Sequence, residues 1–123
     1  MSLDIQILPA TKGSQRVTLA GRLDTNTYED LDEKLAPLLT RELQTLVLDL
    51  GALEYISSAG IRSILQARKA LFPGGKVLAV NPQAQIRKVL DMVQALPLGE
   101  IFATSAEADA YIDKLQREML QGF

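Results

Sequence analysis

Two kinds of strand pattern are visible in the order of apolar and polar residues. Apolar and polar side chains alternate at residues 3–7 and 16–19, and turn-forming residues occupy 12–14 between them. Because successive strand residues face opposite sides, this pattern predicts an opening antiparallel hairpin. Two later runs, 46–50 and 77–80, are almost continuously apolar. Such runs are typical of strands covered on both faces in a parallel sheet.

Helical spacing of core-facing residues occurs in four other segments, and suitable end signals flank them. Asn26 and Thr27 can cap the first helix, and Pro37 is expected to end or kink it. Residues 73–75, Pro-Gly-Gly, close the second helix, and Asn81-Pro82 opens the third. A capping box at 104–107 starts the fourth. The core-facing positions are Tyr28, Leu31, Leu35 and Leu38; Ile61, Ile64, Leu65, Arg68 and Leu71; Ile86, Val89, Leu90 and Val93; and Ala108, Tyr111, Ile112, Leu115 and Met119.

The order of these elements predicts an α/β fold. A last short strand is expected at Ile101-Phe102, so strands and helices alternate after the opening hairpin. Such alternation calls for right-handed crossovers between parallel strands. We therefore predict one compact domain over residues 1–123. Its mixed sheet has four or five strands with a parallel centre and an antiparallel first strand, accompanied by about four helices.

The amino-acid composition excludes several classes of function. Fifteen acidic and thirteen basic residues give a formal charge of −2, so no basic field is available to bind nucleic acid or an anionic membrane. The chain has neither cysteine nor histidine, which excludes disulfides, thiolate chemistry and most common catalytic machinery. No apolar run reaches the roughly 20 residues of a membrane span, and residues 1–6 lack the build of a signal peptide. A protein or small-ligand partner in the cytoplasm is expected.

The segment after the strand that is expected to end at Leu50 is unusual. In a parallel sheet, binding sites gather beyond the carboxyl ends of the strands. Here residues 51–60 form a predicted loop, and its last four positions, Ser57-Ser58-Ala59-Gly60, are all small. A serine at a helix start feels roughly half a positive charge and several unpaired N–H groups, which favour an added phosphate. Small neighbours would also let a partner's backbone approach closely.

Structural interpretations of the same residues stay open at this point. Ser57 or Ser58 would serve as an ordinary N-cap, and Gly60 would permit tight packing of the helix on the sheet. Asp24 follows a strand in the same way, and it suits either contact with a partner or a turn. Asp49, inside an apolar strand, is interpreted as a strand-end aspartate bonded to loop backbone.

Residues 55–65, Tyr-Ile-Ser-Ser-Ala-Gly-Ile-Arg-Ser-Ile-Leu, resemble the signature loop and helix of STAS-domain anti-sigma factor antagonists. Residues 21–24, 47–50 and 81–82 also resemble landmarks of that family, and the element order is similar over almost the whole chain. The resemblance implies a single STAS-like domain.

Site residues follow from the resemblance by position. Ser58 matches the family's phosphoacceptor serine. Ser57 stands where aspartate is usual, and Ala59 stands where a second serine or threonine is usual. Arg62 is also expected to be exposed, because it points away from the apolar face of its helix. The expected partner-binding residues are Asp24, Ser57, Ser58, Ala59, Gly60, Ile61 and Arg62.

The family implies partner switching. The unphosphorylated antagonist would bind an anti-sigma factor that is also a serine kinase of the histidine-kinase-like ATPase type. Phosphorylation would release it, and a serine phosphatase would restore it. ATP and Mg²⁺ belong to the kinase, so no cofactor is expected for this chain.

Two functions other than partner switching are alternatives for this chain. A nucleophilic Ser58 would need glycine two residues earlier, where Ile56 stands, and a histidine base, which the chain lacks. An enzyme is therefore not expected. The stronger rival is a STAS subunit or regulator of a transporter, of the lipid-transport ATPase type, or of a signalling assembly, with no phosphorylation cycle.

Overall fold

The computed structural model describes residues 2–9, 13–93 and 100–121. Five strands, four α-helices and one short 3₁₀ helix follow one another in this part of the chain. In order they are β1 (Leu3–Ile7), β2 (Ser14–Leu23), α1 (Tyr28–Leu35), η1 (Ala36–Leu38), β3 (Thr45–Ile56), α2 (Ser58–Leu71), β4 (Lys76–Val80), α3 (Ala84–Val93), β5 (Ile101–Phe102) and α4 (Ser105–Gln121).

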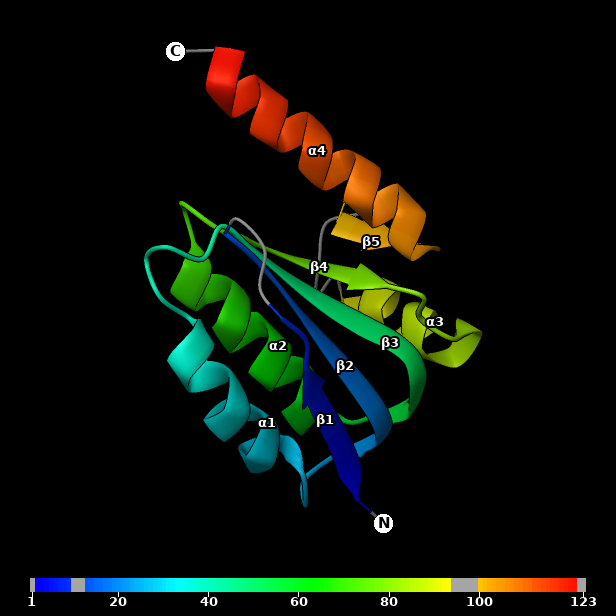
Figure 1. Cartoon of the computed structure of the whole chain (residues 1–123). Coiled ribbons are helices and arrows are strands. Elements are labelled where there is room, and N and C mark those ends of the chain that lie inside the picture. The colour runs from blue at the N-terminus through cyan, green and yellow to red at the C-terminus, as the bar shows by residue number, and fades with distance from the viewer. Residues whose placement is uncertain (1, 10–12, 94–99, 122–123) are drawn as a thin grey trace.

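The strands form one mixed sheet in the order β1-β2-β3-β4-β5. β1 pairs with β2 in the antiparallel sense, whereas every later pair is parallel. The predicted hairpin and parallel centre are therefore confirmed. Because the strand order follows the chain, right-handed crossovers place α1, α2 and α3 on the same face of the sheet, and Figure 1 shows α4 on the opposite side of it.

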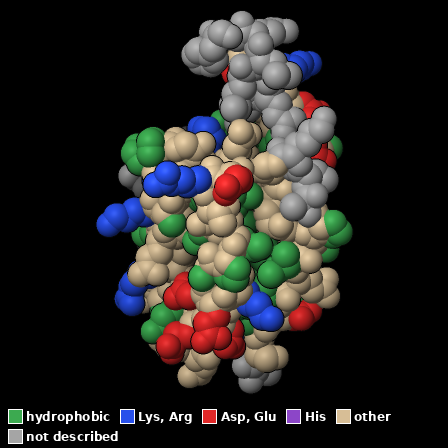
Figure 2. Space-filling view, turned by 60° about the vertical axis from the view of Figure 1, so that its left-hand side comes forward, with side chains coloured by type: hydrophobic (Ala, Val, Ile, Leu, Met, Phe, Trp, Pro, Cys, Tyr) green, Lys and Arg blue, Asp and Glu red, His purple; other side chains and the backbone are tan. Residues whose placement is uncertain are grey.

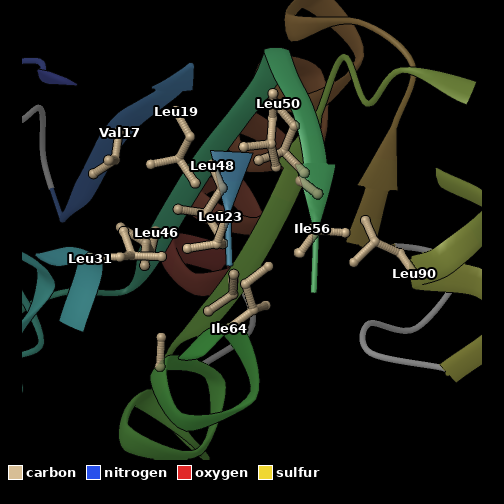
Figure 3. Close-up of a cluster of buried hydrophobic side chains, with 14 of the residues drawn as sticks. Val17, Leu19, Leu23, Leu31, Leu46, Leu48, Leu50, Ile56, Ile64 and Leu90 are labelled. Carbon is tan, nitrogen blue, oxygen red and sulfur yellow. The ribbon is translucent and has the colours of Figure 1, made fainter. Parts of the chain in front are cut away.

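The main core lies between the sheet and the first three helices. Alternate residues of β2 and β3 point into this layer, where they meet Leu31 of α1, Ile64 of α2 and Leu90 of α3 (Figure 3). These three helix residues are almost completely buried. The strand residues labelled in Figure 3 are Val17, Leu19, Leu23, Leu46, Leu48, Leu50 and Ile56.

A smaller core lies on the other face, under α4. Ala108 packs against Val47 and Leu78, and the Phe102 and Tyr111 rings lie 5.3 Å apart. α4 covers mainly β4 and β5. On the β1–β2 part of this face, Asp4 and Gln6 are exposed, and Arg16 and Thr18 are partly exposed.

Helix ends follow the local sequence signals. α1 stops at Leu35, and the short η1 turn contains Pro37, as expected. The Thr104 hydroxyl accepts a hydrogen bond of 3.2 Å from the N–H of Glu107, which is half of the predicted capping box. The turn residues 10–12 and the side chains of Val93, Leu115 and Met119 lie outside the described part. Among the described residues, no helix combines the length and apolar character that a bilayer span requires.

One strand is longer than the sequence predicted. We expected a strand ending at Leu50 and a loop over 51–60, but β3 continues to Ile56. β2 provides the reason, since its second half pairs with residues 52–56 after a register shift. Leu53 and Ile56 are buried along this extension, whereas β4 has already ended beside Asp49.

One helix residue faces the opposite way from the prediction. Leu65 was assigned to the core-facing side of α2, but its side chain is 39% exposed. The buried stripe runs through Ile64, Ala67 and Leu71 instead. Leu65 therefore lies on the solvent side of α2, together with Arg62.

Candidate functional site

The candidate site lies where β2 and β3 end side by side. Leu23 and Ile56 are partners in the sheet register, and the N–H of Ser57 donates to the carbonyl of Leu23 at 2.9 Å. The loop after β2 and the start of α2 therefore meet at one edge of the sheet. This is the edge at which parallel sheets place their binding sites.

Ser57 and Ser58 have different roles at the start of α2. Ser57 is the N-cap, with an extended backbone and a side chain that accepts from the N–H of Gly60 at 3.4 Å. Ser58 is the first helical residue, and it is exposed. The first turn of α2 contains no acidic side chain. The N-cap role thus belongs to Ser57, and the Ser58 hydroxyl is accessible beside the positive end of the helix dipole.

The next three residues are buried under this exposed hydroxyl. Ala59 is 4% exposed and Ile61 is 7% exposed. A Cβ atom added to Gly60 would lie 2.6 Å from Cγ of Leu23 and 3.0 Å from Cγ1 of Ile56. The packing interpretation of Gly60 is therefore supported. Ala59, Gly60 and Ile61 hold the helix start against the sheet, and their contact with a partner stays a prediction.

Asp24 sits in a tight turn between β2 and α1. Its Oδ1 accepts from the N–H of Asn26 at 2.9 Å. Its own N–H donates to the hydroxyl of Thr27 at 2.9 Å, and that hydroxyl donates to the carbonyl of Arg22 at 2.8 Å. The turn interpretation of Asp24 is thus supported by geometry. Only 16% of the Asp24 side chain is exposed, which leaves a small surface for a partner to contact. A role of Asp24 in partner contact stays a prediction.

Sequence reasoning missed a neighbouring pair of residues. The Arg22 guanidinium lies 4.2 Å from the centre of the Tyr55 ring, and its Nε lies 3.5 Å from Oδ2 of Asp24. Tyr55 is 42% exposed. An exposed aromatic ring held by a cation is a rigid contact surface at low entropic cost. The pair forms because Arg22 and Tyr55 are register partners beyond the shift between β2 and β3.

The free edge of the β3 extension is covered by side chains. β4 ends at Val80, so within the described part of the chain no strand pairs on that side with the residues after Asp49. The side-chain amides of Gln83 and Gln85 donate to the carbonyls of Gly51 and Glu54 at 3.0 and 3.2 Å.

Asp49 anchors the start of the β3 extension. Its Oδ1 accepts from the N–H of Gly51 at 3.0 Å and from Nδ2 of Asn81 at 3.3 Å. The predicted strand-end position of Asp49 is wrong, because β3 continues past it to Ile56, and the backbone N–H that it binds belongs to the same strand and not to a loop.

The turn hydrogen bonds affect the titration of Asp24. The hydrogen bond from the N–H of Asn26 lowers the pKa of Asp24 below its ordinary value. Burial acts in the opposite direction. Hydrogen bonds from Thr27 and Arg22, and the charge of Arg22, lower this pKa further. A carboxyl whose pKa is depressed by folding stabilises the fold above its unfolded pKa of about 3.9. That stability is lost as pH falls through the folded value.

Asp24→Asn is therefore expected to remove a pH-dependent part of the stability. At pH 7 the variant should have a lower free energy of unfolding than the parent, because Asn cannot provide the charge that faces Arg22. The difference should shrink below about pH 4, where Asp24 is increasingly protonated. Urea unfolding from pH 2.5 to 7 measures it, and a difference that does not change with pH would contradict the assignment.

Two comparisons with known proteins agree on the family. The model of the STAS domain matches residues 8–108. A Bordetella bronchiseptica protein named as an anti-sigma factor antagonist, BtrV, is 33% identical over 93 residues, which are 75% of this chain and 79% of that protein. The chain belongs to the STAS domain family. The resemblance noted from the sequence is thereby confirmed.

Solved structures agree on the fold. The Bacillus cell fate determinant SpoIIAA in its phosphorylated form has a TM-score of 0.70 at 22% identity, covering 89% of this chain and 99% of that one. A murine anion transporter, Solute Carrier 26 family member A9, has a TM-score of 0.73 at 18% identity, and the match covers 86% of this chain but only 18% of the transporter.

The candidate site therefore combines an exposed serine at a helix start, a hydrogen-bonded turn at Asp24 and a stacked Arg22–Tyr55 pair. Within the described residues, no group of three or more acidic side chains is arranged to hold a metal ion.

Proposed function

We propose that this chain is an anti-sigma factor antagonist whose binding is controlled by phosphorylation of Ser58. In this proposal the unphosphorylated chain binds an anti-sigma factor that is also a serine kinase of the histidine-kinase-like ATPase type. Phosphorylation releases the antagonist, the freed anti-sigma factor captures its sigma factor, and a serine phosphatase reverses the step. The chain itself is a non-enzymatic cytoplasmic regulator without a cofactor.

The observation that carries the proposal is the placement of Ser58. It is the exposed first residue of α2, directly after the N-cap residue Ser57. A kinase can reach such a hydroxyl without unfolding the helix, and the helix N-terminus favours the added anion. The relative BtrV is named as an anti-sigma factor antagonist, and SpoIIAA is known in unphosphorylated and phosphorylated forms.

Replacement of the usual aspartate by Ser57 keeps one property of that position and removes another. Serine and aspartate are about equally good N-cap residues, and Ser57 makes the capping bond. The negative charge next to the acceptor is absent, however. A kinase that acts on this chain must therefore recognise Ser58 through other contacts, for which exposed Arg62 and the partly exposed Asp24 turn are candidates.

The rival function is that of a STAS subunit attached to a transporter. The likeness to the murine anion transporter concerns the fold alone. An exposed hydroxyl at the start of α2 is not needed for a permanent subunit contact. The two functions differ in whether Ser58 carries phosphate and in which protein is bound.

Phosphorylation of the full chain by the anti-sigma factor that it captures tests the proposal. The captured protein, with ATP and Mg²⁺, should add one phosphate, and peptide mass spectrometry should place it on Ser58. Ser57→Ala should still be phosphorylated, and Ser58→Ala should not. Phosphate on Ser57, or a captured transporter component with no phosphate added, would refute the assignment.

A further inference from the structure

The solvent side of α2 carries a regular row of residues. From Ser58 to Lys69 the row advances by steps of four, three and four positions along the helix. Residues with this spacing lie on one narrow face, and the pattern is that of a coiled-coil seam. We use the name α2 ridge for Ser58, Arg62, Leu65 and Lys69 on this face together with exposed Phe72, the C-cap residue that follows the helix with an extended backbone.

The α2 ridge combines exposed apolar and cationic side chains. Leu65 and Phe72 are 39% and 72% exposed, although both are large and apolar. Arg62 and Lys69 are exposed between them. Neither cation forms an ion pair within the described part of the chain. α2 has no aspartate or glutamate at all. An unpartnered face of this kind is suited to a partner with acidic and apolar side chains.

The far end of the α2 ridge adjoins a surface hollow of about 350 Å³. Phe72 borders this hollow, together with Leu39, Leu43 and Pro73 from the neighbouring connections. A partner side chain can enter here beside Phe72. The 14 residues of α2 span about 21 Å, so the ridge extends far beyond the Ser58 hydroxyl.

We propose that the α2 ridge is the docking surface for an acidic, amphipathic helix of the anti-sigma factor. This inference rests on the proposed function and names the chemistry of its partner. The apolar side chains of the incoming helix pack on Leu65 and Phe72, and its carboxylates face Arg62 and Lys69. Ser58 lies at one end of the contact, where a phosphate would oppose the acidic helix.

Other occupants of the α2 ridge are disfavoured by charge. Pairing with α2 of a second copy would place Arg62 and Lys69 against the same cations of that copy, and like charges across an interface are repulsive. An anionic membrane is a broad surface that would also meet the acidic side chains of α1, which packs beside α2, whereas a single helix can lie along the α2 ridge alone. Figure 2 shows Asp and Glu side chains gathered at the lower end of one face, and Lys and Arg side chains mainly towards its upper left.

Site-specific photo-crosslinking identifies the occupant. The full chain would carry p-benzoylphenylalanine at Leu65 or Phe72 and, as a control, at Met92, which is 73% exposed on α3. We expect both ridge positions, but not position 92, to cross-link to an acid-rich helical segment of the anti-sigma factor. Cross-linking to a second copy of this chain, or no cross-link at either ridge position, would overturn the proposal.

A matched pair of charge reversals measures the electrostatic part. Lys69 and Lys88 are both exposed helical lysines, but only Lys69 is on the ridge. Lys69→Glu should weaken binding of the captured anti-sigma factor roughly fivefold to tenfold at low salt, and Lys88→Glu should change it less than twofold. Equal effects of the two variants on binding would contradict docking of the partner on the α2 ridge.

The outcomes also separate the ridge from the proposed function. Phosphorylation of Ser58 without any cross-link from positions 65 and 72 would refute docking on the α2 ridge but support the proposed function. A cross-link to an acidic helix of a protein that is not an anti-sigma factor would support the α2 ridge as a docking surface but refute the proposed function.

Discussion

Ser58→Asp is expected to lower the affinity for the anti-sigma factor a hundredfold or more while the free energy of unfolding stays nearly the same. The fold tolerates the charge because Ser58 is exposed at the helix start, where an anion is stabilised by about 0.3 to 1 kcal/mol. At a close-packed interface the same charge would be buried without a partner, which costs several kcal/mol. A hundredfold loss corresponds to about 2.7 kcal/mol. Titration calorimetry and urea unfolding measure the two quantities.

Two substitutions control for this result. Ser58→Ala should bind with nearly unchanged affinity, because only the modifiable hydroxyl is removed. Ser57→Ala should instead lower the free energy of unfolding by about 1 kcal/mol, since it removes the N-cap bond to Gly60. Normal affinity in Ser58→Asp would show that Ser58 lies outside the interface.

Gly60→Val is expected to destabilise the fold by about 1 to 3 kcal/mol, the range typical of overpacked cores. The first added carbon would lie 2.6 Å from Cγ of Leu23, and Leu23 is completely buried. Neither Leu23 nor Ile56 can move aside without disturbing the strand ends that position Ser57. Chemical denaturation measures the loss, and binding by the folded fraction should fall as well.

Gly74→Ala is a control that adds a Cβ atom at a position with open space. No atom lies within 4 Å of a Cβ built at Gly74, so this substitution should change the free energy of unfolding by less than about 0.5 kcal/mol, as at ordinary surface positions. If both variants were equally stable, the tight packing of α2 on β2 would not hold the helix start in place.

Local patterns were sufficient to predict most of the fold. Alternation at Leu3 and Ile5 predicted the hairpin, and the continuous apolar run from Leu46 to Leu50 predicted a buried parallel strand. Pro37 predicted the end of α1. Each of these signals acts over a few neighbouring residues, so it is readable without knowledge of the tertiary structure.

Features that depend on distant partners could not be predicted in the same way. The extension of β3 to Ile56 requires the second half of β2 and a shift in register, which no local pattern reveals. The stacking of Arg22 on Tyr55 depends on the same shift. Leu65 is predicted to face the core because it lies four positions after Ile61, but the side of α2 that is covered depends on how the helix is rotated against the sheet.

Within the site, sequence reasoning located Ser58 and Asp24 but could not assign their structural roles. Ser57 and Ser58 are chemically identical, so only the backbone geometry separates the N-cap residue from the first helical residue. The turn bonds of Asp24 likewise depend on Thr27 and Asn26 being folded around it.

The glutamine cover on β3 also bears on the solution behaviour of the protein. A strand edge with unpaired carbonyls can template pairing with another chain and so begin aggregation. Here the Gln83 and Gln85 amides occupy carbonyls of Gly51 and Glu54, directly before the segment that leads to Ser58. Primary amides do not titrate and are not screened by salt as lysine is. The edge therefore stays protected over a wide range of pH and ionic strength, including conditions that alter the charged surfaces around it.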